Sequence, residues 1–161
     1  MKYQGPILKL TNTPFAINDV ATGGFVKAQF KEIVDGDTAY FFIQGQEEKV
    51  RLFVVNTPEI FPNCEPYGLD AKGYSLNVLS HAKKIFLQSD PNDHLRDETP
   101  SKRLLAWVWV DNQLLNYKLV EKGYAKVQYV YHEKMLYLDE LKKAEKIAIQ
   151  KNRRLFKNRK D

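Results

Sequence analysis

The chain has 161 residues with 43% hydrophobic and 28% charged residues, values that exclude an intrinsically disordered protein and allow one domain with a sizeable core. Its single cysteine, Cys64, excludes an intramolecular disulfide and a zinc site built from cysteines, and no apolar run reaches the length of a membrane span. The net charge of +5 comes from the end of the chain, where residues 134–161 hold 10 Lys and Arg against 4 Asp and Glu. This segment is either a surface for a polyanion or a solvated helix face.

The first 23 residues have loop chemistry and predict an N-terminal arm rather than a second domain. Three β-rich runs follow, separated by turns at Asp35-Gly36 and around Gly45. Gly36 suits the first turn because glycine tolerates a positive φ. A helix, a short strand, a long polar loop, another strand and two helices come next. The predicted strands span residues 24–34, 38–43, 49–55, 84–88 and 103–110, and the predicted helices span residues 67–81, 115–122 and about 136–152.

This order, β-β-β-α-β-β-α-α, predicts an α+β fold in which a five-stranded β-barrel of the OB-fold type has three α-helices packed outside it. A ferredoxin-like fold is the other small α+β candidate, but three consecutive strands at the start do not suit it. We expect an arm at residues 1–23, a barrel domain at residues 24–157 and a basic tail at residues 158–161.

Acidic and amide side chains gather at the turns of the first three strands. Asp35 and Asp37 flank one turn, and Asn56 and Thr57 end the third strand, so a regular meander would bring them to one end of the barrel. Their oxygens are hard ligands that suit calcium or magnesium, although the spacing of an EF-hand loop is absent. Taken alone, Asp35 and Asp37 are more simply explained as turn residues.

Two arginines begin strands, and one acid follows a strand. Paired guanidinium groups at Arg51 and Arg103 suit a phosphate whose negative charge grows in a transition state. Glu59 could orient or deprotonate a water molecule beside that phosphate. The simpler alternatives are that Arg51 pairs with Glu47 or Glu48 at the surface and that Glu59 is a solvated loop acid.

Two tyrosines close to the end of the chain alternate in a segment that we expect to be extended. Tyr129 and Tyr131 would then point to one side, where aromatic rings beside cations can stack on a nucleobase. The alternative is that they are ordinary core or rim tyrosines. The three histidines lack the spacing of metal ligands, and no nucleophilic triad is predicted.

Together these residues resemble the staphylococcal nuclease (thermonuclease) family over roughly residues 25–156. The matching motifs occur in the family's order: Val34-Asp35-Gly36-Asp37-Thr38, Arg51-Leu52 through Thr57-Pro58-Glu59, Tyr67-Gly68 opening a helix, residues 103–109, residues 123–127 and Tyr129-Val130-Tyr131. The resemblance implies a calcium-dependent endonuclease that hydrolyses phosphodiester bonds of DNA and RNA, cleaving the 5′ P–O bond and leaving 3′-phosphates. It also implies a monomer without a membrane partner.

The resemblance further implies a role for each matching position. The implied catalytic residues are Arg51, Glu59 and Arg103, the implied metal ligands are Asp37, Asn56 and Thr57 with Asp35 behind them, and the implied nucleotide-binding residues are Tyr129, Tyr131 and Lys102. We also expect a secreted or cell-envelope bacterial protein whose leader is absent from this chain, with a cytoplasmic protein as the alternative.

Three positions depart from the family. Asn56 stands where the family has Asp, and the lost charge predicts weaker calcium binding or use of magnesium or another divalent ion. Lys102 lies next to Arg103 rather than three residues ahead of it, and Leu104 replaces a glycine. These departures leave open a catalytically weakened or inactive OB-fold module that binds nucleic acid, and a fold reused for protein interaction.

Overall fold

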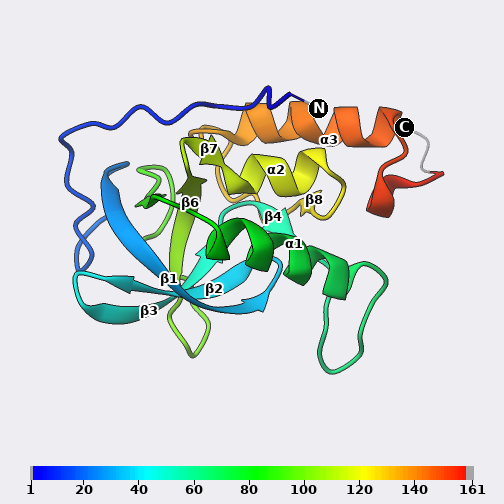
Figure 1. The fold of residues 1–161 in the computed structure, drawn as a ribbon. Coiled ribbons are helices and arrows are strands. Elements are labelled where there is room, and N and C mark those ends of the chain that lie inside the picture. Colours follow the sequence, from blue (N-terminus) through cyan, green and yellow to red (C-terminus); the bar gives the residue numbers. More distant parts are fainter. Residues whose placement is uncertain (1, 159–161) are drawn as a thin grey trace.

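Five strands close into a β-barrel in the computed structural model, which describes residues 2–158 (Figure 1). Antiparallel pairing joins β1 to β2, β2 to β3, β1 to β5 and β5 to β6, and parallel pairing of β3 with β6 closes the barrel. The strands are β1 (Phe25–Asp35), β2 (Thr38–Ile43), β3 (Gln46–Leu52), β5 (Ile85–Gln88) and β6 (Leu104–Val110). The predicted five-stranded barrel is confirmed.

Alternation along the strands explains the barrel core. On β2, Ala39, Phe41 and Ile43 are fully buried, whereas Phe42 between them is exposed. The alternation is imperfect on β1 because its pairing with β2 shifts register at two places, as in a β-bulge. Strand β6 is buried along almost its whole length, since α2 covers its outer face.

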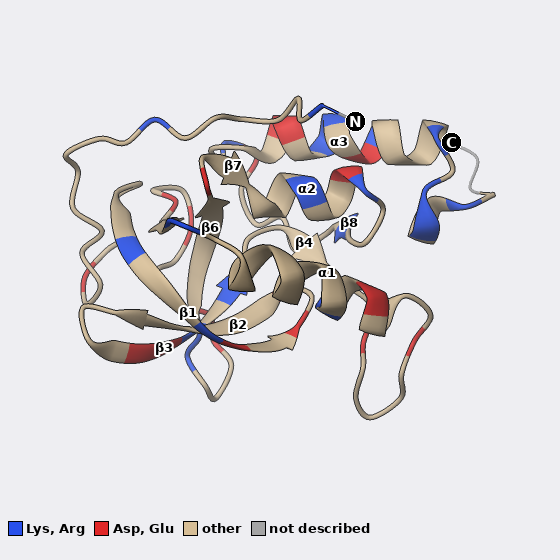
Figure 2. Ribbon diagram, viewed as in Figure 1, with Lys and Arg blue, Asp and Glu red and all other residues tan. Residues whose placement is uncertain are grey.

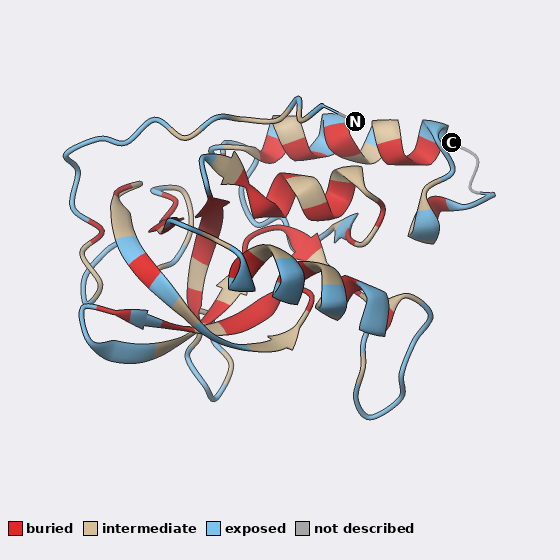
Figure 3. Cartoon of the chain, in the orientation of Figure 1, coloured by how far each residue is buried: buried red, intermediate tan, exposed pale blue. Residues whose placement is uncertain are grey.

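Three α-helices pack outside the barrel, as predicted. They are α1 (Gly68–Ser80), α2 (Leu115–Glu121) and α3 (Leu138–Gln150), and a 3-10 turn, η1 (Arg154–Phe156), follows the last of them. Helix α2 packs against α3, whose buried residues lie on its side towards α2 (Figure 3). The most deeply buried residues of α1 include Ala71, Ser75 and Leu79, which recur every four residues along the helix.

The third predicted strand is interrupted, and this changes the geometry next to the candidate site. We predicted one strand over residues 49–55, but β3 ends at Leu52 and the chain turns at Val54, whose φ is 50°. A β-branched residue rarely adopts this left-handed conformation. The turn sends Val55–Asn56 into a separate short strand, β4, which pairs with β8 (Lys126–Val127), while β7 (Gln113–Leu114) pairs with β6.

A buried polar network joins the barrel to α3. Asp90 Oδ2 accepts hydrogen bonds from Trp107 Nε1 at 3.0 Å and from the backbone N of Leu136 at 2.8 Å, and Oδ1 accepts one from the backbone N of Asn92. Both the carboxylate and the Trp107 ring are fully buried. The network therefore fixes the segment that leads into α3 against β6.

The N-terminal arm follows the surface from the side of α3 to the start of β1 (Figure 1). Phe15 is buried, and Ser89 Oγ accepts hydrogen bonds from the backbone N of Thr22 and of Gly23. Residues 159–161 of the predicted basic tail lie outside the described residues. Within residues 2–158, every helix is too short or too polar to cross a bilayer.

Candidate active site

A cavity of about 740 Å³ brings together most of the predicted site residues. It is bordered by the β1–β2 turn, β3, the segment after β4, the polar loop between β5 and β6, and the segment after β8. The predicted residues that line it are Asp35, Asp37, Arg51, Asn56, Glu59, Arg103, Tyr129 and Tyr131. Thr57 contacts Asp37 just behind the wall, whereas Lys102 is exposed and does not line the cavity.

The β1–β2 turn is packed tightly against α1. Ser75 Oγ donates a hydrogen bond to the carbonyl of Gly36 at 2.7 Å. A Cβ on Gly36 would lie 2.7 Å from Thr57 Cγ2 and 2.8 Å from Ala71 Cβ. Gly36 does not use the positive φ that glycine tolerates, since the positive-φ glycines among residues 2–158 are Gly23, Gly45 and Gly123. Close approach of α1 and Thr57, rather than backbone conformation, requires glycine here.

Asp37 is held by donors on several sides. Its Oδ2 accepts hydrogen bonds from the backbone N and the Oγ1 of Thr57, at 2.9 and 3.1 Å, and lies 3.4 Å from Arg51 Nη2. Its Oδ1 accepts a hydrogen bond from Thr38 Oγ1. The residue is only 5% exposed, so its orientation is determined by the fold rather than by solvent.

The oxygens around Asp37 suit a hard divalent cation. Asp35 Oδ1 accepts a hydrogen bond from the backbone N of Asp37, and burial together with the Asp37 charge raises the pKa of Asp35 to about 7. A cation would relieve this repulsion. Residues 2–158 contain no cluster of three or more His, Cys, Asp or Glu side chains suited to a metal. An ion here would therefore need neutral oxygens as well, from Asn56 and the Thr57 carbonyl.

The side chain of Asn56 is oriented from β8. Its Nδ2 donates a hydrogen bond to Gln128 Oε1 at 2.9 Å, and its backbone lies opposite Lys126 in the β4–β8 pair. Because the amide nitrogen is engaged with Gln128, Oδ1 is the atom that Asn56 can offer to a cation.

Arg51 is held between an acid, a carbonyl and a ring. Its Nη1 donates to the Leu52 carbonyl at 2.7 Å, and its Cζ lies 5.7 Å from the centroid of the Tyr129 ring. The simpler alternative, in which Arg51 pairs with Glu47 or Glu48, is wrong. Glu47 pairs with Lys31 and Glu48 pairs with Arg96, so Arg51 pairs with Asp37.

The two tyrosines reach the cavity by a different backbone path from the one predicted. Tyr129 has a φ of 61°, so the segment is not extended at this residue. Even so, both rings line the cavity, with Tyr129 47% and Tyr131 73% exposed. Exposed aromatic surface next to Arg51 can stack on a planar ligand.

Arg103 is oriented by Asp97, which the sequence analysis missed. Its Nε donates to Asp97 Oδ2 at 2.6 Å and its backbone N donates to Oδ1 at 3.0 Å, while Thr99 Oγ1 also donates to Oδ1. Burial alone would raise the pKa of Asp97, but the hydrogen bonds and the guanidinium charge outweigh it and lower the pKa. The available signal was the Asp-x-Thr pattern in the polar loop, which is typical of a side chain that bonds to nearby backbone.

Arg96 attaches the same loop to the barrel and was also missed. Its two terminal nitrogens donate to the two carboxylate oxygens of Glu48 on β3, at 2.9 and 3.1 Å. Nη1 also donates to the carbonyl of Lys102 at 3.0 Å. This bidentate pair holds the loop, and with it Arg103, beside β3.

Glu59 lies on the exposed side of the cavity. Its backbone N donates to Glu65 Oε1 at 2.6 Å, and its carbonyl accepts from the backbone N of Glu65. These two bonds close the loop and leave the Glu59 carboxylate at the cavity wall. A carboxylate in this position can accept a proton from a water molecule held in the cavity.

Comparisons with known proteins find one family model and several related nucleases. A family model described as staphylococcal nuclease homologue matches residues 49–158. The SPbeta prophage-derived endonuclease YokF of Bacillus subtilis is 37% identical over 118 residues, which cover 71% of this chain and 38% of that protein. Endonuclease YncB of Bacillus subtilis is 34% identical over 76% of this chain and 58% of its own length. A thermonuclease of Staphylococcus intermedius is 33% identical over 62% of this chain and 58% of its own length. The chain thus spans between 38% and 58% of these three relatives.

Proposed function

Because the chain belongs to the staphylococcal nuclease family, we propose that it is a divalent-metal-dependent endonuclease that hydrolyses phosphodiester bonds of DNA and RNA. The proposed cleavage is at the 5′ P–O bond and leaves 3′-phosphates. The observation that carries the proposal is the cavity in which Arg51 and Arg103 lie with Glu59 and the Asp35–Asp37 carboxylates. The three relatives, two endonucleases and a thermonuclease, support the same class of reaction.

In the proposed reaction a water oxygen bonds to phosphorus as the bond from phosphorus to the 5′-oxygen breaks, and the departing 5′-oxygen takes up a proton from solvent. Glu59 accepts the proton of the water. Arg51 and Arg103 donate hydrogen bonds to the phosphate oxygens, on which charge grows in the transition state, and Arg103 lies nearer the leaving 5′-oxygen. The stabilisation of the transition state by these arginines depends on their being preorganised. Asp37 orients Arg51, and Asp97 orients Arg103.

Asp37, Asn56 and the Thr57 carbonyl would hold a calcium ion, with Asp35 behind them. Magnesium or another divalent ion is the alternative, because Asn56 contributes no charge. When bound, such an ion supplies a Lewis acid beside the phosphate. Tyr129 and Tyr131 would stack on a nucleobase, and the predicted contact of Lys102 with a phosphate would have to lie outside the cavity.

The second candidate is a catalytically weakened OB-fold module that binds nucleic acid without cutting it. Asn56 favours this alternative, since it replaces a charged ligand that the family uses. Digestion of heat-denatured DNA and of RNA with calcium, magnesium or EDTA separates the two functions. We expect cleavage that depends on the metal and products that polymerase extends only after phosphatase treatment. Binding without any metal-dependent cleavage at high enzyme concentration would leave the second candidate.

Asn56→Asp is expected to strengthen calcium binding by about tenfold or more. The change adds a negative charge to a site that already holds Asp35 and Asp37, and close charges in a partly buried site interact by several kcal/mol. Isothermal titration with calcium measures the effect. Asn77→Asp, which adds the same charge on the exposed side of α1, is the control. An unchanged dissociation constant in Asn56→Asp would place residue 56 outside the ligands of the ion.

Asp97→Asn is expected to lower kcat about tenfold with little change in KM. Asp97 acts through Arg103, and a hydrogen bond to a charged group contributes about 1.5–3 kcal/mol, of which part is retained by the amide. Glu98→Gln, which neutralises the adjacent acid of the same cavity, is the control. If Asp97 has a purely structural role, the effect of Asp97→Asn on kcat adds to that of Arg103→Ala in the double variant. A positioning role predicts that Asp97→Asn costs nothing further when Arg103 is already alanine.

A further inference from the structure

The outer face of the β2–β3 hairpin continues from the cavity as a strip of aromatic and basic side chains, flanked by two acids, Glu32 opposite Tyr40 and Glu47 opposite Phe42. Val50 lies between Lys49 and Arg51, Leu52 follows Arg51, and both are buried in the barrel. Lys49 and Arg51 therefore share the outer face of β3. Tyr40 pairs with Lys49 across the hairpin. The strip therefore begins two residues from Arg51, which lines the cavity.

The strip consists of Lys31, Tyr40, Phe42 and Lys49. Tyr40 and Phe42 alternate on β2 with the fully buried Ala39, Phe41 and Ile43, so both point outwards. Lys31 Nζ lies 5.8 Å from the centroids of both rings, and Lys49 Nζ lies 5.8 Å from the centroid of Tyr40. Phe42 is 38% exposed, which is unusual for a phenylalanine inside a strand.

The charges differ between the two ends of the strip. Near the cavity, Lys49 lies two residues before Arg51 on β3. Basic and acidic residues both occur along this strand (Figure 2). At the far end, Glu47 forms an ion pair of 2.7 Å with Lys31, and both side chains are well exposed. Exposed pairs of this kind contribute little to stability and exchange readily for another anion. Arg51 and Glu47 are four positions apart on β3, a length of about 13 Å.

We propose that this strip binds a single-stranded stretch of DNA or RNA that extends from the nucleotide held in the cavity. Bases stack on Tyr40 and Phe42, and phosphates contact Lys49 and, in place of Glu47, Lys31. Rings with cations beside them form the usual platform for unpaired bases, whereas a duplex hides the base faces. The inference rests on the proposed function, since it takes the occupant to be the same strand that enters the cavity.

The test is equilibrium binding of labelled single-stranded DNA in EDTA, so that no cleavage occurs. A trinucleotide is compared with a twelve-nucleotide strand by fluorescence anisotropy. We expect Tyr40→Thr combined with Phe42→Thr to weaken binding of the longer strand by about tenfold or more and to leave binding of the trinucleotide unchanged. Threonine suits a strand, so the hairpin is expected to fold, and circular dichroism checks this.

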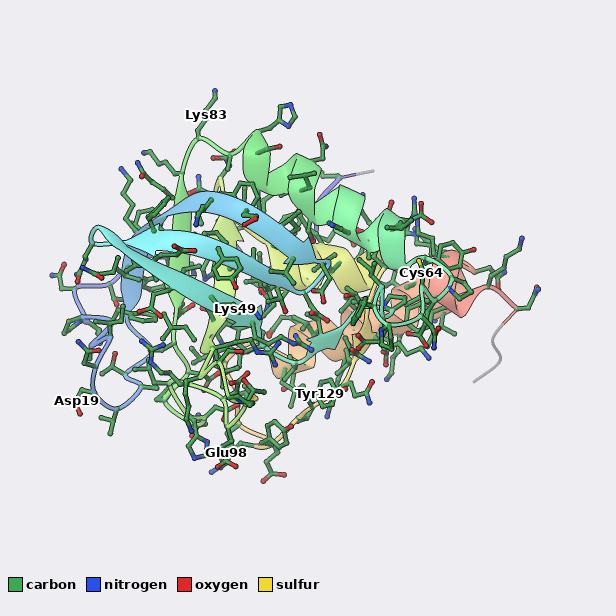
Figure 4. The ribbon with its side chains drawn as sticks, turned by 90° about the horizontal axis from the view of Figure 1, so that it is seen from below. Asp19, Lys49, Cys64, Lys83, Glu98 and Tyr129 are labelled. Carbon is green, nitrogen blue, oxygen red and sulfur yellow. The ribbon has the colours of Figure 1, made fainter. Side chains whose placement is uncertain are left out.

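Lys49→Gln provides a second, smaller change. It is expected to reduce the dependence of binding on salt by about one phosphate contact for the longer strand. Lys83→Gln removes the same charge from the connection between α1 and β5, well away from Lys49 (Figure 4), and is expected to change nothing. Figure 4 also shows Tyr129 and Glu98, two residues that line the cavity.

Three results would contradict binding of nucleic acid at the strip. The first is unchanged binding of the longer strand in the double variant, and the second is an equal loss for the trinucleotide and the longer strand. The third is stronger binding of a twelve-base-pair duplex than of the single strand. The proposed nuclease function fails separately, since it requires metal-dependent cleavage and the binding assay does not.

Discussion

Arg103→Ala is expected to lower kcat by about 10²–10³, which is the usual cost of removing one preorganised donor from a developing negative charge. Asp97 already orients the guanidinium through Nε, so the side chain loses little freedom when a phosphate arrives. The fold should survive, because Arg103 is partly exposed and lies at the end of the loop before β6. Steady-state kinetics on denatured DNA and thermal unfolding of the same preparation measure the two effects.

Arg96→Ala is the matched control for Arg103→Ala. Arg96 lines the same cavity, but both its terminal nitrogens are taken by Glu48. We expect its loss to loosen the loop and to lower kcat by a smaller factor than loss of Arg103. Equal effects of the two substitutions would show that Arg103 acts through the loop and not on the phosphate.

Asp90→Ala is expected to lower the free energy of unfolding by about 3 kcal/mol. It leaves the Trp107 Nε1–H and the Leu136 backbone N–H without their acceptor, and each buried unsatisfied donor costs about 1–3 kcal/mol. For a domain of this size the loss corresponds to a decrease of about 6–12 °C in Tm. Denaturant unfolding and calorimetry measure it.

Two neighbouring substitutions act as controls for Asp90→Ala. Asp90→Asn retains one acceptor oxygen and should lose less stability. Asp93→Ala removes a nearby carboxylate that, within residues 2–158, accepts hydrogen bonds from the adjacent His94, and it should destabilise the protein less than Asp90→Ala. If Asp93→Ala destabilised the protein as much as Asp90→Ala, the buried network would not be the cause.

The order of elements was predictable because it depends on local patterns. Alternation over the β-rich runs, helical periodicity over residues 67–81 and 136–152, and the turn at Gly45 are all properties of short segments. The interruption of the third strand was not predictable in this way. The left-handed backbone at Val54 contradicts the local preference of valine, and it occurs where Phe53 and Val54 bond to β6 and to the segment after β8.

Most of the candidate site was predicted from residue types and from the family resemblance, and the cavity brings those residues together. The residues that were missed are the ones that orient others. Arg96 has no distinctive local chemistry and Asp97 has only the Asp-x-Thr pattern, so their roles in orienting Arg103 arise only when the polar loop folds back on β3. Lys102 was predicted as a site residue, but it does not line the cavity although it is adjacent to Arg103 in the sequence.

The order of strands and helices, and the set of charged and aromatic side chains available for a site, follow from the sequence alone. The partners of those side chains depend on how the chain folds. Asp37 rather than Glu48 pairs with Arg51, Gln128 orients Asn56, and α1 with Thr57 requires the glycine between Asp35 and Asp37. These choices depend on packing between segments distant in sequence, where distances of a few tenths of an ångström decide which contacts form.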